Sequence, residues 1–202
     1  MSVAGTLDRR AAPTPEPWLD RVPREIRTDR LLLREWRADD FEPYAAFFAD
    51  EASARHVGGR CDRPDAWRRF ATGIGHWAIR GYGMYALETP SDRSFVGFAG
   101  VWRPEGWPEL EVGWCLMPAA RGSGYATEAA AACLATGFGT FGLGRLVSYI
   151  DPENLASRRV AERLGAVREG TIALAGGTAD VFLHRPRGAG AGRPARERGR
   201  AT

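Results

Sequence analysis

Apolar residues recur along the chain with two spacings, one of them typical of helices. After Asp39 and Asp40, the residues Phe41, Tyr44 and Phe48 follow one another at steps of three and four. The same spacing returns further along, and the pattern predicts helices over Phe41–Phe48, Arg63–Ile79, Tyr125–Phe138 and Leu155–Leu164. Asp39 or Asp40 is expected to cap the first helix, and Gly165 is expected to end the last.

The second spacing consists of short apolar runs between turn residues, which is typical of strands. Strands are predicted over Leu31–Arg34, Tyr82–Glu88, Phe95–Trp102, Leu110–Met117, Leu146–Ile150, Val167–Leu174 and Ala179–His184. Pro90, Ser91 and Asp92 mark the turn of a hairpin between the second and third of these runs. Strands that alternate with helices toward the C-terminus indicate an α/β fold with one mixed sheet.

Periodicity is missing at both ends of the 202-residue chain. Residues 1–24 are rich in Pro, Ala and charge and are predicted to form a flexible leader. Residues 186–202 repeat that composition and are predicted to form a disordered basic tail. The remaining segment, residues 25–185, has the length of a single domain.

The charge of the chain is divided unevenly. All 28 basic residues are arginine, and residues 185–202 carry six of them with one glutamate. Residues 25–184 carry eighteen arginines and twenty-one acids, so the sequence isoelectric point near 9.0 comes from the tail. A nucleic-acid-binding domain would have a basic stripe on folded elements, so no nucleic acid is expected as a partner.

The sequence also lacks signals of export and of membrane insertion. No apolar run is long enough to cross a membrane, and no secretory signal is found. Three cysteines lie far apart without the spacing of metal ligands, which predicts a reducing cytoplasmic location and no metal. The sequence does not indicate an oligomeric state.

The most informative stretch is Glu109 to Ala130, where a predicted strand runs through a glycine-containing turn into a helix. Gly122 and Gly124 allow a sharp turn and a close approach of a ligand to the backbone. The helix that follows directs free N–H groups and the positive end of its dipole at the turn. The sequence therefore predicts a site for a pyrophosphate.

Two nucleotide motifs can be set aside. The formal G-x-G-x-x-G that begins at Gly137 follows a helix and precedes a strand, which is the reverse of the order in dinucleotide-binding folds. A P-loop requires a lysine, and the chain has none.

The segment from Arg121 to Ala126, between a strand ending at Pro118 and a Thr-Glu-Ala helix, resembles the coenzyme-binding motif of the GNAT superfamily of N-acetyltransferases. The segment Asp151–Gly165 resembles a second motif of that family. Together with Arg27–Arg34, the motifs are most similar to the branch of ribosomal-protein N-terminal acetyltransferases. The resemblance implies a mostly antiparallel mixed sheet that is splayed to hold acetyl-CoA, with helices on both faces.

The resemblance also implies roles for single residues. The pyrophosphate would be held by backbone N–H groups of Arg121, Gly122, Ser123, Gly124, Tyr125 and Ala126. The pantetheine arm would pair with the strand end at Cys115, Leu116 and Met117, where one N–H would also polarise the thioester carbonyl. Asn154 would bind the pantetheine, and Ser157 would protonate the leaving thiolate.

Structural roles compete with several of these assignments. Asn154 is equally well placed to cap a helix, and Cys115 is better explained as a small strand residue than as a nucleophile. Glu128, in the first turn of its helix, complements the helix dipole. His56, His76 and His184 are isolated in the sequence, and structural roles are expected for them.

An acceptor amine must lose a proton before it attacks, and Glu111 is the leading candidate for the base. By strand periodicity, Glu111 shares a face with Cys115, and Val112 and Leu116 face the core. Glu88 and Glu109 are rivals, and a solvated position on the strand face without a catalytic role is the alternative for Glu111. The sequence thus predicts acetyl transfer from acetyl-CoA to a primary amine. The acceptor, which is a protein N-terminus or a small molecule, is expected to contact the helices at Asp39–Phe48 and Trp67–Ile79. A small-molecule acetyltransferase and a non-catalytic acetyl-CoA-binding module are the alternatives.

Overall fold

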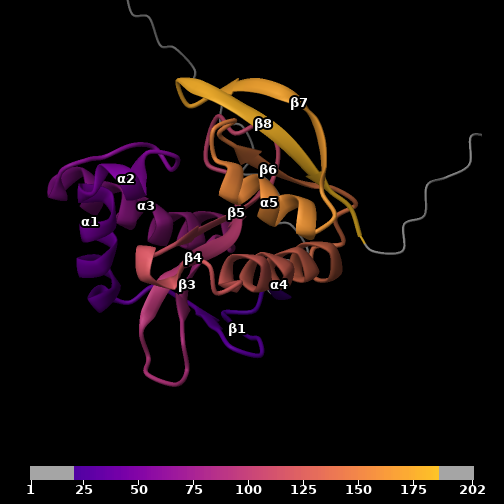
Figure 1. Cartoon of the computed structure of the whole chain (residues 1–202). Coiled ribbons are helices and arrows are strands. Elements are labelled where there is room, and N and C mark those ends of the chain that lie inside the picture. The colour runs from indigo at the N-terminus through magenta and orange to yellow at the C-terminus, as the bar shows by residue number, and fades with distance from the viewer. Residues whose placement is uncertain (1–20, 187–202) are drawn as a thin grey trace, which may run out of the picture.

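Eight strands form one sheet in the part of the chain that the structure, a computed structural model, describes, residues 21–186 (Figure 1). Their spatial order is β1-β2-β3-β4-β5-β6-β8-β7, and all neighbours are antiparallel except β5 and β6, which are parallel. The strands are β1 (Glu25–Arg27), β2 (Leu32–Arg34), β3 (Met84–Glu88), β4 (Phe95–Trp102), β5 (Glu111–Leu116), β6 (Leu146–Ile150), β7 (Val167–Leu174) and β8 (Gly177–His184). The predicted mixed, mostly antiparallel sheet is confirmed.

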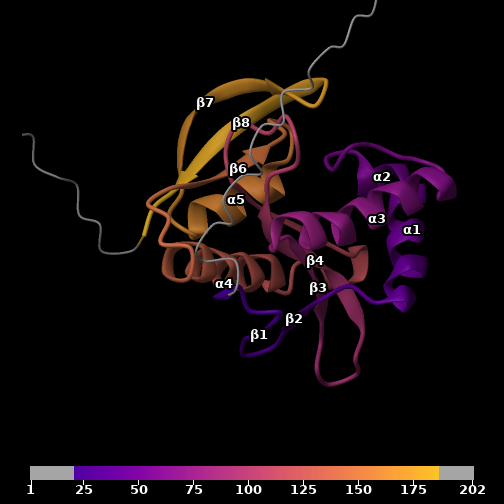
Figure 2. The same cartoon turned by 180° about the vertical axis from the view of Figure 1, so that it is seen from behind.

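Helices lie on both faces of this sheet, as expected. They are α1 (Phe41–Ala49), α2 (Glu51–Ala54), α3 (Arg63–Arg80), α4 (Tyr125–Gly139) and α5 (Leu155–Arg163). Figure 1 shows α4 in front of the sheet, and the view from behind in Figure 2 shows α3 in front of it. Short 3₁₀ turns at Ala38–Asp40 and Pro118–Ala120 precede α1 and follow β5.

The four long helices lie where the apolar spacing predicts them, and local signals explain their ends. The Asp62 carboxylate accepts a hydrogen bond from the Asp65 N–H at the start of α3, and Gly81 ends that helix with φ +73°. Gly165, with φ +84°, follows α5 as expected. The sequence patterns missed β1 and α2, because three or four residues are too few to show a period. β3 begins at Met84 rather than at Tyr82, and β8 begins at Gly177 rather than at Ala179.

Both faces of β5 are buried, although the sequence pattern assigned only one of them to the core. Val112 and Leu116 belong to a buried cluster with Ala129 and Cys133 of α4. Cys115, on the opposite face, is 7% exposed and packs in a second cluster with aromatic residues of α1 and α3. The aromatic side chains of the two helices that were expected to contact the acceptor are therefore largely core residues; they are Phe41, Tyr44, Phe47, Phe48 and Phe70.

Asp40 takes the expected N-cap position of α1, but its side chain makes no cap hydrogen bond to that helix. Its carboxylate instead accepts from the Arg37 backbone N–H at 2.7 Å, in the 3₁₀ turn before α1, and binds the buried Arg34 guanidinium through two hydrogen bonds of 2.8 Å. Arg34 also donates to Glu88 at 2.7 Å, which ties β2 and β3 to the start of α1. A buried arginine requires partners of this kind because an unpaired charge in the interior is strongly unfavourable.

The predicted leader and tail lie mostly outside the described residues. At the beginning of the described part, Val22 is buried in the main cluster and the Pro23 carbonyl accepts a hydrogen bond from the Tyr85 hydroxyl at 2.6 Å. None of the helices in residues 21–186 combines the length and the apolar character that a membrane span needs.

Candidate active site

The sheet opens between β5 and β6. The two strands share one register position, Glu111 with Val147, and the Val147 N–H donates to the Leu110 carbonyl at 3.1 Å. Beyond this point a side-chain hydrogen bond takes the place of backbone pairing between the strands: the Ser148 hydroxyl of β6 donates to the Val112 carbonyl of β5 at 2.6 Å. No further pairing of β5 with β6 is found in residues 21–186, so the C-terminal half of β5 has a free edge.

Strand geometry decides which groups face this opening. The Met117 N–H donates to Val96 of β4 at 3.0 Å, so it is directed away from the opening. Because successive residues of a strand direct their N–H groups to alternate edges, the N–H groups of Leu116 and Trp114 face the gap. Of Cys115, Leu116 and Met117, Leu116 is therefore the residue that can offer its N–H to a ligand in the opening.

The turn before α4 presents a row of backbone donors. Gly122 and Gly124 both have φ +82°, in the left-handed region that favours glycine. Gly124 occupies the N-cap position of α4, and no side chain caps the helix. Within the described residues, the N–H groups of the loop and of the first helical turn have no hydrogen-bond acceptor; they belong to Gly122, Ser123, Gly124, Tyr125, Ala126 and Thr127. A row of this kind at a helix N-terminus is suited to bind a diphosphate.

Arg121 connects this loop to the strand end. Its Nε donates to the Leu116 carbonyl at 3.3 Å, on the same edge of β5 that faces the opening. The loop and the free edge of β5 are thus adjacent parts of one surface.

Glu111 lies at the point where the sheet opens. Its carboxylate accepts a hydrogen bond from the Trp107 indole N–H at 2.6 Å. Protein surrounds the carboxyl group, although part of the side chain reaches solvent, and this burial raises the pKa of Glu111 to about 7. The Trp107 indole and the backbone of Tyr149 oppose the rise because they stabilise the charged form. A carboxyl group with a pKa near 7 can exchange a proton at neutral pH.

The rival carboxylates have different surroundings. Glu88 is 3% exposed and lies within salt-bridge distance of Arg34, Arg37 and Arg93. Glu109 binds Arg145 through hydrogen bonds of 2.5 and 3.0 Å. Arginine partners occupy both carboxylates, so these environments favour Glu111 as the base.

Asn154 caps α5, because its side-chain oxygen accepts a hydrogen bond from the Ser157 N–H at 3.1 Å. The cap uses only the oxygen, and no acceptor for the amide NH₂ is found among the described residues. The Ser157 hydroxyl likewise has no partner there. Both groups therefore remain open to a ligand.

Cys115 has the surroundings of a packing residue, since burial raises the pKa of its thiol to about 12. The structure records Cys61, Cys115 and Cys133 as free thiols.

Each histidine contacts a polar group from another part of the chain, although the three stand alone in the sequence. The His56 Nδ1 lies 2.6 Å from an Asp151 carboxylate oxygen, across 95 positions of sequence. His56 follows α2, and Asp151 follows β6 directly, so the contact joins the segment between α2 and α3 to the end of β6. Periodicity contains no signal for a contact of this range.

The other two histidines have structural roles. His76 donates to the Tyr82 carbonyl and accepts from the Arg103 N–H, at 2.7 and 3.3 Å. His184 is 2% exposed, and its Nε2 lies 3.0 Å from the Ser148 oxygen. Because the Ser148 proton is donated to Val112, His184 supplies the proton of this hydrogen bond, and its Nδ1 has no partner in the described part of the chain.

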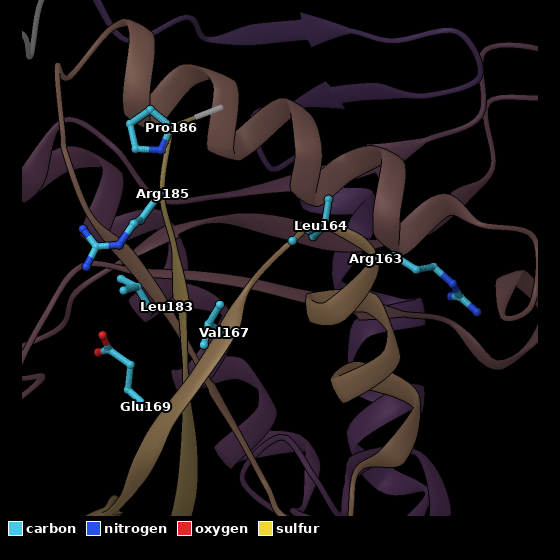
Figure 3. Close-up of a pocket in the computed structure, with 8 residues that line it drawn as sticks. Arg163, Leu164, Val167, Glu169, Leu183, Arg185 and Pro186 are labelled. Atoms are coloured by element: carbon cyan, nitrogen blue, oxygen red, sulfur yellow. The ribbon is translucent and has the colours of Figure 1, made fainter. Parts of the chain in front are cut away.

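A separate pocket of about 490 Å³ lies between the end of α5 and the β7–β8 pair (Figure 3). Leu164, Val167 and Leu183 line it together with charged residues, and the Arg163 side chain extends away from Glu169 and Arg185. None of its lining residues belongs to β5 or to the loop before α4. Within residues 21–186, no three His, Cys, Asp or Glu side chains are grouped in a way that could hold a metal ion.

Comparison with known proteins identifies this arrangement. The model of the GNAT acetyltransferase domain matches residues 30–167. The chain belongs to the GNAT acetyltransferase family. An acetyltransferase from Agrobacterium tumefaciens has a solved structure that is 33% identical and superimposes with a TM-score of 0.75, over 80% of this chain and 94% of the other. A Bacillus subtilis protein described as the uncharacterized N-acetyltransferase YnaD is 29% identical over 146 residues, which are 72% of this chain and 84% of that protein.

A more distant structure bears on the predicted branch. A protein from Vibrio cholerae, described as a putative ribosomal-protein-serine acetyltransferase, is 22% identical with a TM-score of 0.66, over 80% of this chain and 97% of the other. At this identity the likeness shows the fold alone. The family uses acetyl-CoA, and the chain is accordingly a GNAT acyltransferase; the acceptor is not specified by these relatives.

Proposed function

We propose that this protein transfers the acetyl group of acetyl-CoA to a primary amine by direct attack. The row of unpaired N–H groups from Gly122 to Thr127, next to the free edge of β5, is the observation that carries this proposal. The row fits the pyrophosphate of the coenzyme, and the free edge fits the amide groups of pantetheine.

The residues around the opening supply the steps of the reaction. Glu111 accepts a proton from the ammonium form of the acceptor, directly or through water. The amine nitrogen then attacks the thioester carbonyl carbon, and the Leu116 N–H stabilises the negative charge that develops on the carbonyl oxygen. The carbon–sulfur bond breaks as the nitrogen loses its second proton, and the thiolate takes a proton from Ser157 or from water, which regains one from the nitrogen. The buried Cys115 thiol is held in its neutral form, which supports transfer without an acyl-enzyme on this residue.

The acceptor is an amine of either a protein N-terminus or a small molecule. The resemblance of the motifs to ribosomal-protein N-terminal acetyltransferases favours the former. We place the reaction in the cytoplasm, because three free cysteines suit a reducing compartment.

A panel of acceptors tests the proposal. Release of free coenzyme A is followed with N-terminal peptides and with small amines, and acetyl-CoA and NADH binding are compared by calorimetry. The proposal predicts acetyl-CoA binding and turnover with at least one class of amine. Binding without turnover on any amine would indicate a non-catalytic module, and NADH binding without acetyl-CoA binding would contradict the proposal.

A further inference from the structure

Arg30 lies outside the strand–loop–helix motif but contacts the loop that presents the backbone donors. It belongs to the turn between β1 and β2, and its Nη1 donates to the Ser123 carbonyl at 2.8 Å. Its guanidinium carbon lies 4.9 Å from the centre of the Tyr125 ring. A Cβ atom added at Gly124 would be 3.3 Å from the Arg30 Nη2. Arg30 thus contacts three consecutive residues of the loop and the helix start.

A carboxylate of α4 holds Arg30 in this position. The Glu128 side chain, in the first turn of α4, accepts from the Arg30 Nε at 2.8 Å and from the Arg30 backbone N–H at 2.9 Å. The Thr28 hydroxyl donates to the same carboxylate at 2.6 Å. Burial raises the pKa of Glu128, but these hydrogen bonds outweigh it and the pKa is lowered overall. Glu128 is therefore charged and neutralises Arg30, so the guanidinium acts here mainly through its directed hydrogen bonds.

The contact with Ser123 fixes the orientation of one peptide group in the loop. The Ser123 carbonyl and the Gly124 N–H belong to the same peptide, which is trans. In a trans peptide the two groups point in opposite directions. Because Arg30 holds the carbonyl on its own side, the Gly124 N–H is directed to the other side of the loop. Gly124, at φ +82° and without a Cβ, would otherwise reorient easily.

We infer that Arg30 is a positioning residue for acetyl-CoA: the Thr28–Arg30–Glu128 network holds the loop so that its N–H groups converge on the coenzyme pyrophosphate. The inference rests on the proposed function of the loop. A loop that is already ordered loses less conformational entropy when the ligand binds, which increases affinity without a new contact.

The test compares Arg30→Gln with a matched control, Arg24→Gln. Arg24 also makes an ion pair, with Glu35 at 2.8 Å, and also lies over an aromatic ring, that of Trp77 at 5.3 Å. It does not contact the loop. Acetyl-CoA affinity is measured by calorimetry, and kcat/KM is measured with acetyl-CoA and with S-acetylpantetheine, which lacks the pyrophosphate.

Arg30→Gln is expected to weaken acetyl-CoA binding about tenfold, the effect of roughly one charge-assisted hydrogen bond. The kcat/KM with S-acetylpantetheine should stay at the wild-type value, and Arg24→Gln should match wild type with both donors. Arg30→Lys keeps the charge but loses the planar fork, so a weakened affinity is expected for it as well.

Two outcomes would overturn the inference. One is an unchanged acetyl-CoA affinity in both Arg30 variants. The other is an equal loss with acetyl-CoA and S-acetylpantetheine, which would show general damage to the domain. If Arg30→Gln does not fold, Arg30→Lys and Glu128→Gln are measured in the same way. Wild-type protein that failed to bind acetyl-CoA would contradict the proposed function itself, and this result is distinct from the other two.

Discussion

Replacement of Glu111 by glutamine tests the proposed base most directly. The amide keeps the size of the side chain and can keep a contact with Trp107, but it cannot accept a proton from an ammonium group. A general base typically contributes ~10²- to 10⁴-fold in rate, so a loss in this range is expected at neutral pH. Coenzyme affinity should change little, since Glu111 is not assigned to the pyrophosphate or the pantetheine.

The pH dependence follows from the raised pKa of Glu111, which is about 7. The base is active in its charged form, so wild-type kcat/KM should fall about tenfold for each pH unit below 7. An α-amine acceptor, with an ordinary pKa of ~7.7–8.0, is about one-tenth free at pH 7 and mostly free at pH 9. The loss in Glu111→Gln should therefore decrease at high pH, where the acceptor needs less help.

A second variant distinguishes the titration of Glu111 from the titration of the acceptor amine. Trp107→Phe removes the indole N–H that stabilises the Glu111 carboxylate. The acidic limb of the pH–rate profile should then move upward by roughly one pH unit, as expected for the loss of one hydrogen bond to a charged group. The titration of the acceptor amine would not move with this substitution.

The assay is kcat/KM against pH for wild type, Glu111→Gln and Trp107→Phe, with Glu88→Gln and Glu109→Gln as controls and with the best acceptor of the panel. An unchanged profile in Glu111→Gln together with a collapse of one control would show that the base is elsewhere. A pH–rate profile like that of wild type in all four variants would show that the enzyme accepts free amines and acts by positioning.

Three further outcomes are expected. Gly124→Val should weaken acetyl-CoA binding strongly in calorimetry with the fold retained, whereas Gly176→Val, at a similar φ of +79° in the β7–β8 turn, should leave the affinity unchanged. Removal of residues 187–202 should leave kcat/KM intact and lower the isoelectric point, and a loss of activity in a folded truncated protein would assign the tail to the acceptor site. Burial lowers the pKa of His184 to about 4, below its ordinary value of 6.5, so the unfolded chain binds the proton first as pH falls. Between pH 6.5 and 4 the contribution of His184 to the free energy of unfolding in urea should thus fall by about 3 kcal/mol, measured as the difference between wild type and His184→Asn, because the raised pKa of Glu111 acts in the opposite direction in both proteins.

The parts of the site that the sequence could predict are those formed by neighbouring residues. The strand, the turn with Gly122 and Gly124, and the start of α4 follow one another within about fifteen positions, so their spacing is visible in the sequence. The same holds for the cap that Asn154 makes to Ser157, three residues away. Helix and strand periods are local properties, and they located most elements correctly.

The parts that the sequence could not predict depend on contacts between distant segments. Arg30 and Glu128 are 98 positions apart, and His56 and Asp151 are 95. Such pairs are set by the topology of the sheet, which periodicity does not encode. Thr28 and Arg30 lie in the turn between β1 and β2, where no helix or strand period relates their side chains, so the sequence contained no signal that both bind one carboxylate.

The opening between β5 and β6 is held at both ends, which explains how a sheet can tolerate a gap at its centre. At the closed end, Glu109 before β5 binds Arg145 before β6, and Ser148 joins the two strands where their backbone ladder stops. At the open end, Asp151 after β6 binds His56 from the segment beside α1. These contacts fix the two strands relative to each other beyond their single paired position. The free edge of β5 is therefore a feature that distant side chains maintain, and a ligand that pairs with it does not have to displace a neighbouring strand.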